Sequence, residues 1–199
     1  TRYMTSSVDF DELQATNDEV YAWIEVPGTV INYAVVQSAT DDLFYINHAV
    51  DKSYFSGGSI FSQRYNTTTF QDSMTVLYGH NSRSQAMFAQ LNNFADASFF
   101  EQNQSIYIYT PEKVYEYQIF AAYPHSSDHL LLCNDFNDPE QFAAYFDSLA
   151  DGVNCNYRRD LFPQFGDKVL TLSTCYRQNR TQRFLVQGVL TQEYTVLKK

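Results

Sequence analysis

The sequence predicts a mainly β fold, a mixed β-barrel with helical inserts. Short runs rich in β-branched and aromatic residues recur along the chain, turn residues separate them, and few segments have helical periodicity. Aromatic residues make up 17% of the 199 residues, so large rings can fill the core of one domain. Short strands with a few helices between them favour a barrel.

The first elements along the chain are an expected helix and a strand. Residues 9–24 carry apolar side chains at a broken helical spacing, with a capping residue at position 7 or 9. The Pro-Gly pair at 27–28 ends this helix, and the next run predicts a strand over 30–37.

The rest of the chain is predicted to alternate between strands and short helices. Helices are expected over 41–48 and 84–91, and Asp138 followed by Pro139 marks the start of a helix that reaches Gly152. Strands are predicted over residues 59–61, 73–78, 106–109, 114–122, 168–174 and 183–190, with a hairpin turn at 111–112.

The net charge of −10 is unevenly distributed. Residues 1–150 hold 19 acidic and 5 basic residues, whereas residues 151–199 hold 4 acidic and 8 basic residues. No nucleic-acid partner is expected, because phosphate neutralisation needs a sustained basic face. The sequence also contains no run of about 20 apolar residues that predicts a membrane helix, and no visible signal peptide.

A cysteine at the end of a predicted strand is the leading candidate nucleophile. The segment TLSTC at 171–175 ends its strand at Cys175, and Arg183 opens the next strand, so both residues would lie at one end of a sheet. A nearby cation favours the thiolate and can stabilise an oxyanion. His80, just after the strand over 73–78, is the histidine best placed to transfer protons.

Cysteine, histidine and arginine also have ordinary structural roles. A free cysteine is often a buried and inert side chain, a histidine after glycine is often a turn residue, and a surface arginine often forms a weak ion pair. Cys133 and Cys155 match no motif and are expected to serve packing, while a disulfide between them stays open. His125 and His129 alone have a spacing typical of a metal site, but they flank an expected loop, and we predict no metal.

The candidate residues together resemble the signature of the sortases, the cysteine transpeptidases of Gram-positive cell surfaces. That signature is a TLxTC strand end, a histidine at an earlier strand end and an arginine on the strand after the cysteine. TLSTC at 171–175, YGHN at 78–81 and Arg183 match it in this order. The resemblance extends from about residue 9 to residue 190.

Further segments resemble class B sortases in particular: WIEVPGT at 23–29, YAVVQ at 33–37, YINH at 45–48, GSIF at 58–61 and MF at 87–88. The helix predicted after Pro139 lies where class B members have an inserted helix, and the Asp-Pro-aromatic lid of class C is not found ahead of the barrel. Two departures stand out. Ala34 replaces a frequent proline, and Tyr176 and Arg177 follow the cysteine where many class B members have an acidic residue.

The resemblance implies an eight-stranded sortase-type β-barrel with an N-terminal helix and an inserted helix between later strands. We expect residues 1–28 to form an N-terminal helical segment packed on the barrel, and residues 29–199 to form the catalytic barrel domain. The implied location is the extracellular face of the cell membrane, with a single-pass N-terminal anchor ahead of Thr1.

The implied activity is transpeptidation without a cofactor. Cys175 would attack the carbonyl of a threonine in the C-terminal sorting signal of a secreted protein and form a thioester. His80 would transfer protons and Arg183 would hold the substrate or the oxyanion, with Arg177 and Arg180 as rival cations. The acceptor would be an amine of a peptidoglycan precursor or a pilin lysine, so wall anchoring and pilin polymerisation both stay open. The residues carried over to the substrate groove are Ser173, Thr174, Tyr78, Leu130 and Leu131.

Two other functions fit the same residues. A cysteine hydrolase would use water as the acceptor, and only product analysis with and without an amine separates it from a transpeptidase. A catalytically silent surface binding domain would keep Cys175 as a structural residue, and an unreactive thiol would favour it.

Overall fold

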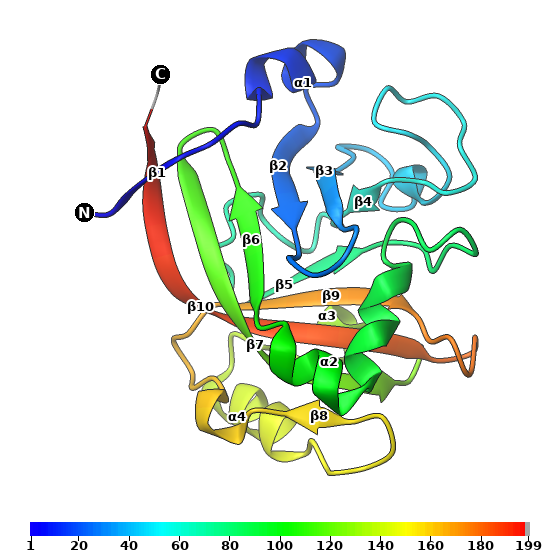
Figure 1. The fold of residues 1–199 in the computed structure, drawn as a ribbon, viewed down its shortest axis with the longest axis vertical. Helices are drawn as coiled ribbons and strands as arrows, with labels where there is room; N and C mark the ends of the chain where they lie inside the picture. Colours follow the sequence, from blue (N-terminus) through cyan, green and yellow to red (C-terminus); the bar gives the residue numbers. More distant parts are fainter. Residues whose placement is uncertain (198–199) are drawn as a thin grey trace.

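The computed structural model describes residues 1–197, whose strands form one ten-stranded sheet (Figure 1). The strand order is β1-β10-β9-β5-β4-β3-β2-β6-β7-β8. Because β10 also pairs with β7, the eight strands from β10 round to β7 close into a barrel, and β1 and β8 lie outside the closed ring. The predicted eight-stranded mixed barrel with helical inserts is therefore confirmed. Residues 198 and 199, the last two of the expected barrel domain, lie outside the described residues.

The elements have the following bounds. The strands are β1 (Tyr3–Thr5), β2 (Val20–Glu25), β3 (Asn32–Val36), β4 (Ile60–Phe61), β5 (Met74–Tyr78), β6 (Ser105–Tyr109), β7 (Lys113–His125), β8 (Asn156–Tyr157), β9 (Val169–Cys175) and β10 (Arg183–Leu197). The α-helices are α1 (Phe10–Thr16), α2 (Ala97–Gln102), α3 (Leu130–Cys133) and α4 (Pro139–Asp147). The 3-10 helices are η1 (Phe44–Ile46), η2 (Ala89–Ala95) and η3 (Arg159–Leu161). None of the helices within residues 1–197 is long and apolar enough to cross a membrane.

The helix predicted over residues 9–24 is wrong beyond Thr16. After Thr16 the backbone becomes extended at Asn17, with φ −155° and ψ 113°, and residues 20–25 form barrel strand β2. Buried and half-buried side chains alternate along β2, but the half-buried positions include Tyr21 and Trp23. Because these half-buried positions carry aromatic residues, the period of two that marks a strand is hidden in the sequence. Part of the expected N-terminal helical segment, residues 1–28, therefore lies in the barrel.

The helix predicted over residues 84–91 is also wrong over its first half. Gln85 and Met87 have positive φ values of 65° and 56°, which an α-helix does not accommodate. The loop folds back so that the Phe88 N–H donates to the His80 carbonyl at 2.9 Å, and η2 starts only at Ala89.

The other two predicted helices form, and both are shorter than predicted: α4 ends at Asp147 instead of Gly152. The expected helix over 41–48 is a single 3-10 turn, η1. The helix predicted from Pro139 forms as α4, where Asp138 caps the first turn by accepting the Glu140 N–H at 3.0 Å. In α4, Phe142 and Phe146 are buried in an apolar cluster with Phe120 of β7, so this inserted helix covers the outside of the barrel (Figure 1).

Strand pairing brings three chemically important chain segments to one end of the barrel. β5 runs parallel to β9, with Tyr78 opposite Ser173, and the Gly79 N–H donates to the Ser173 carbonyl at 3.2 Å. β9 runs antiparallel to β10, with Cys175 opposite Arg183. The residues that leave β5, end β9 and open β10 therefore lie side by side.

Candidate active site

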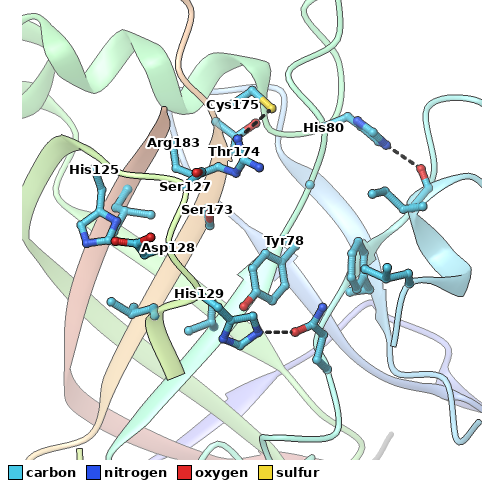
Figure 2. Close-up of a pocket in the computed structure, with 18 residues that line it drawn as sticks. Tyr78, His80, His125, Ser127, Asp128, His129, Ser173, Thr174, Cys175 and Arg183 are labelled. Atoms are coloured by element: carbon cyan, nitrogen blue, oxygen red, sulfur yellow. Dashed lines mark hydrogen bonds between the residues drawn. The ribbon is translucent and has the colours of Figure 1, made fainter. Parts of the chain in front are cut away.

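A cavity of about 240 Å³ opens where β5 and β9 end (Figure 2). Its lining includes all three predicted catalytic residues and four of the five predicted groove residues: Cys175, His80, Arg183, Ser173, Thr174, Tyr78 and Leu130. The fifth, Leu131, instead lines a separate cavity of about 280 Å³ beside Leu132 and Phe136.

Cys175 and Arg183 are direct partners across two antiparallel strands. Cys175 is the last residue of β9 and Arg183 is the first residue of β10. The Arg183 Nη1 atom lies 3.8 Å from the Cys175 Sγ atom, within reach of an N–H···S hydrogen bond. Both side chains are half-buried, so the cation faces the thiol at the edge of the cavity rather than in open solvent.

The rival arginines are placed differently. The Arg177 guanidinium donates to Gln85 Oε1 at 3.2 Å and to the Ala89 carbonyl at 3.3 Å, so it is directed at η2 and the loop before it. Arg180 is exposed in the same loop as Arg177. Among the three arginines, Arg183 is the one with a described contact to the thiol.

His80 lies at the cavity but does not bond to the thiol. Its Nε2–H donates to the Ile46 carbonyl at 2.5 Å, and the ring points away from Cys175 in Figure 2. Gly79 sets the position of His80, because a Cβ at residue 79 would lie 2.6 Å from Ile60 Cδ1 and 2.7 Å from the Phe88 ring. The structure therefore pairs the arginine with the cysteine and holds the histidine on the opposite wall.

Two buried hydroxyl groups of the cavity have no hydrogen-bond partner within residues 1–197. They are Thr174 Oγ1, on a residue with 2% exposure, and the Tyr78 hydroxyl. Burial raises the pKa of Tyr78 to about 12, so its phenol keeps its proton and can donate. A buried polar group without a partner costs about 1–3 kcal/mol, and a ligand that bonds to it would remove that cost.

His129 and Gln63 form a part of the wall that the sequence did not indicate. The His129 Nε2–H donates to Gln63 Oε1 at 2.6 Å, and His129 Nδ1 accepts the Leu132 N–H at 3.2 Å, which caps α3. This arrangement fits the neutral imidazole, and burial lowers the pKa of His129. Gln63 comes from the loop after β4, so only the tertiary fold brings it to His129.

His125 and His129 both line the cavity. Within residues 1–197 no group of three or more His, Cys, Asp or Glu side chains is placed to hold a metal ion. The three cysteines are free thiols, so Cys133 and Cys155 form no disulfide.

A closed β-barrel with a cysteine, an arginine and a histidine around one cavity has the components of a cysteine-dependent acyl-transfer enzyme. Residues 24–191 match the family described as Sortase domain. The chain therefore belongs to the sortase family.

The similar proteins agree on class B within this family. Sortase B of Listeria monocytogenes is 29% identical over 181 residues, which cover 90% of this chain and 72% of that protein. A class B sortase of Streptococcus pyogenes involved in pilus biogenesis has a TM-score of 0.79 and 31% identity, covering 92% of this chain and 98% of its own. A Staphylococcus aureus sortase B–substrate complex has a TM-score of 0.80 and 27% identity, covering 92% of this chain and 84% of its own. The protein is a cysteine transpeptidase of the class B type.

Proposed function

We propose that this enzyme cleaves a C-terminal sorting signal of a secreted protein after threonine and transfers the acyl group to an amine. The observation that carries the proposal is the 3.8 Å contact between Arg183 and the thiol of Cys175 at the mouth of a cavity large enough for part of a peptide. This transpeptidation would take place at the extracellular face of the cell membrane, where secreted substrate proteins pass.

The reaction divides into two acyl transfers. The Cys175 thiolate attacks the threonine carbonyl, the peptide C–N bond breaks, and a thioester C–S bond forms. His80 gives a proton to the departing amine and later accepts one from the incoming amine, which breaks the thioester and forms a new amide. Arg183 donates to the oxyanion in both steps from its position beside the sulfur. The peptide-bond energy is conserved in the thioester, so no cofactor takes part.

His80 must move for this mechanism to run. Its Nε2–H is engaged by the Ile46 carbonyl, so a side-chain rotation that breaks this bond is required before the imidazole can face the thioester. Ile46 also lines the cavity, so a bound peptide that displaces η1 or covers it would release the histidine. Catalytic hydrogen bonds are often long or misaligned in the absence of substrate.

The groove that leads to Cys175 holds the signal peptide in this proposal. Tyr78 and Thr174 line this groove and carry buried hydroxyl groups that have no partner within residues 1–197, and Leu130 supplies an apolar contact. Ser173 lies between these residues on the cavity wall. The Staphylococcus aureus relative whose structure contains a substrate supports peptide binding in a fold of this shape.

The proposed acceptor is an amine, of a peptidoglycan precursor or of a pilin lysine. The Streptococcus pyogenes relative is involved in pilus biogenesis, which supports keeping the second acceptor beside wall anchoring. Incubation with sorting-signal peptides and each of the two amines, followed by product analysis, distinguishes these acceptors and also detects hydrolysis by water.

A library of sorting-signal peptides tests the proposed function directly. Mass spectrometry should find peptide acyl groups attached to Cys175, cut after threonine, and Cys175→Ala should abolish them. Continued transpeptidation by Cys175→Ala would overturn the assignment. A thiol that resists alkylation at neutral pH, with no acylation by any peptide, would favour a silent binding domain.

A further inference from the structure

The backbone carbonyl of Cys175 is held by two asparagine side chains from outside its own strand. Asn81 Nδ2 donates to this oxygen at 3.1 Å, and Asn92 Nδ2 donates to it at 3.3 Å. Asn81 directly follows His80, and Asn92 lies on η2. Neither residue is among those that line the cavity, so their contacts with the site run through the backbone of the nucleophile.

The side-chain amide of Asn92 is buried, and both of its polar atoms form hydrogen bonds. Its exposure is 5%, its Oδ1 accepts the Arg177 N–H at 2.8 Å, and its Nδ2 also donates to the Ala89 carbonyl at 3.2 Å. Asn92 thus bonds to the chain at Cys175 and again two residues later. A buried amide with every polar atom paired fixes the groups that it bonds to, because any displacement leaves a buried group without a partner.

These bonds act where the strand ends and an exposed loop begins. Residues 177–181 are exposed, and the pairing of β9 with β10 stops at Cys175 and Arg183. The Tyr176 N–H donates to the Gln182 carbonyl at 3.1 Å, which holds one side of the peptide after Cys175, and the two asparagine side chains hold its other side, the Cys175 carbonyl. Placement of a nucleophile within a fraction of an ångström matters, since small misplacements reduce rates strongly.

We infer that Asn81 and Asn92 are positioning residues for transpeptidation, which hold the Cys175 carbonyl so that the thiol stays fixed against Arg183. The inference deepens the proposed function and rests on Cys175 as the nucleophile. Asn81 directly follows His80, so its bond to the Cys175 carbonyl also connects the segment that carries His80 to the nucleophile. The two asparagines therefore help to hold His80 and Cys175 at a fixed relative position.

The test combines two single variants and measures thiol chemistry separately from peptide chemistry. Asn92→Asp keeps the shape and the acceptor for Arg177, but it places a carboxylate oxygen against the carbonyls of Cys175 and Ala89. Asn81→Ala removes one donor and adds no charge. The first readout is the rate of Cys175 alkylation by iodoacetamide across the pH range in which thiols titrate, measured on the peptide that contains Cys175. The second is the kcat and KM of acylation by an active sorting-signal peptide.

Asn92→Asp, which adds a charge, and Asn81→Ala, which removes a donor, should affect the alkylation midpoint and kcat differently. In Asn92→Asp the negative charge opposes the thiolate, so the pH midpoint of alkylation should rise by about one unit and the neutral-pH rate should fall about tenfold. The charged or titratable side chains that line the cavity with the thiol are Arg183, His80, His125, His129, Asp128 and Tyr78, and Arg177 lies two residues after Cys175; all of them remain in both variants. Asn81→Ala should leave that midpoint unchanged and lower kcat about tenfold with little change in KM. With Asn92→Ala added as a third single variant, the double variant Asn81→Ala/Asn92→Ala should lose less activity than Asn81→Ala and Asn92→Ala combined, because both side chains bond to one oxygen.

Asn93→Asp is the matched control, because it adds the same charge to the next residue of η2 without a side-chain bond to the site. Its alkylation profile and kcat should match those of the parent enzyme.

Equal effects in Asn93→Asp and Asn92→Asp, or a normal kcat in folded Asn81→Ala, would overturn the inference. If Asn92→Asp does not fold, Asn81→Ala decides alone, since its side chain is half-buried. If the parent enzyme reacts with iodoacetamide but with no peptide, the proposed function fails, whereas the alkylation profile of Asn92→Asp still tests whether Asn92 lies against Cys175.

Discussion

Arg183 Nη1 lies 3.8 Å from Cys175 Sγ, and the two residues are opposite each other in the β9–β10 register. A strand pair fixes backbone positions to within a narrow range, so the first residue of β10 and the last of β9 meet without any help from a loop. The contact therefore follows from the barrel itself, and it places the cation on the sulfur side of the cavity.

Removing the Arg183 guanidinium should strongly slow acylation. Arg183→Gln keeps a polar side chain but loses the charge, so acyl-enzyme formation should slow by about 10²–10³-fold, as for loss of one oxyanion donor. Single-turnover acylation of Cys175 measures this rate. Arg177→Gln, which removes a guanidinium directed at η2, is the matched control and should keep most of the rate. Equal losses in the two variants would contradict the assignment of the cationic role.

Removing the His80 imidazole should abolish proton transfer while leaving the fold intact. The side chain is half-buried and, within residues 1–197, bonds only to the Ile46 carbonyl, so His80→Ala should change the melting temperature little. The turnover number should fall by about 10²–10⁴-fold, the usual contribution of a general acid–base residue. Thermal unfolding and kcat are measured on the same sample. A variant with parent-like kcat would show that another group moves the proton.

A methyl group at Gly79 should disturb the site through packing. In Gly79→Ala the new Cβ would overlap Ile60 Cδ1 and the Phe88 ring, both of them buried. Overpacking of this kind typically costs about 1–3 kcal/mol of unfolding free energy. Urea denaturation should show that loss together with lower activity, because His80 is the next residue. An unchanged free energy of unfolding would mean that the Phe88 ring shifts to make room without destabilising the protein. Gly166→Ala is a useful comparison, since its Cβ would meet nothing within 4 Å although its positive φ of 105° adds backbone strain.

Thiol titration should find three reactive groups. Cys133, Cys155 and Cys175 are free, so denatured protein without reductant should react at three sites. The double variant Cys133→Ser/Cys155→Ser should keep its transpeptidase activity, because neither residue lines the cavity. One reactive thiol in denaturant would instead reveal a disulfide.

His129 should make stability depend on pH. Burial lowers the pKa of His129 in the folded protein, so the unfolded chain binds the proton more tightly. Stability from this residue is therefore present above the unfolded pKa of about 6.5 and is lost as the pH falls toward the lower folded pKa. Urea denaturation above and below this window should show a smaller acid-induced loss for His129→Gln than for the parent. An equal loss in both proteins would contradict the role of His129.

The sequence predicted those element boundaries and site residues that short local motifs determine. TLSTC marked the end of β9, Pro139 marked α4, and Arg183 marked the start of β10. Each of these signals lies within a few residues, and strand pairing then fixes their arrangement.

The sequence did not predict what depends on contacts between distant segments. β2 was missed because its half-buried positions carry the aromatic residues Tyr21 and Trp23, so polar and apolar residues do not alternate along it. The bond from His80 to Ile46 spans 34 residues, and that from Asn92 to Cys175 spans 83, so no local pattern records either of them. Leu131 is another example. It directly follows Leu130 on α3, but Leu130 lines the cavity with Cys175 whereas Leu131 lines a separate cavity.

The intact mass of the enzyme after mixing with an uncleaved sorting-signal peptide is the most direct test of the central claim. An acyl-enzyme intermediate should appear as a mass increase equal to the peptide up to its threonine, located on Cys175 and released by hydroxylamine as a thioester is. Cys175→Ala should show no increase. Cleavage of the peptide without any adduct on Cys175, or an adduct on another residue, would contradict the account.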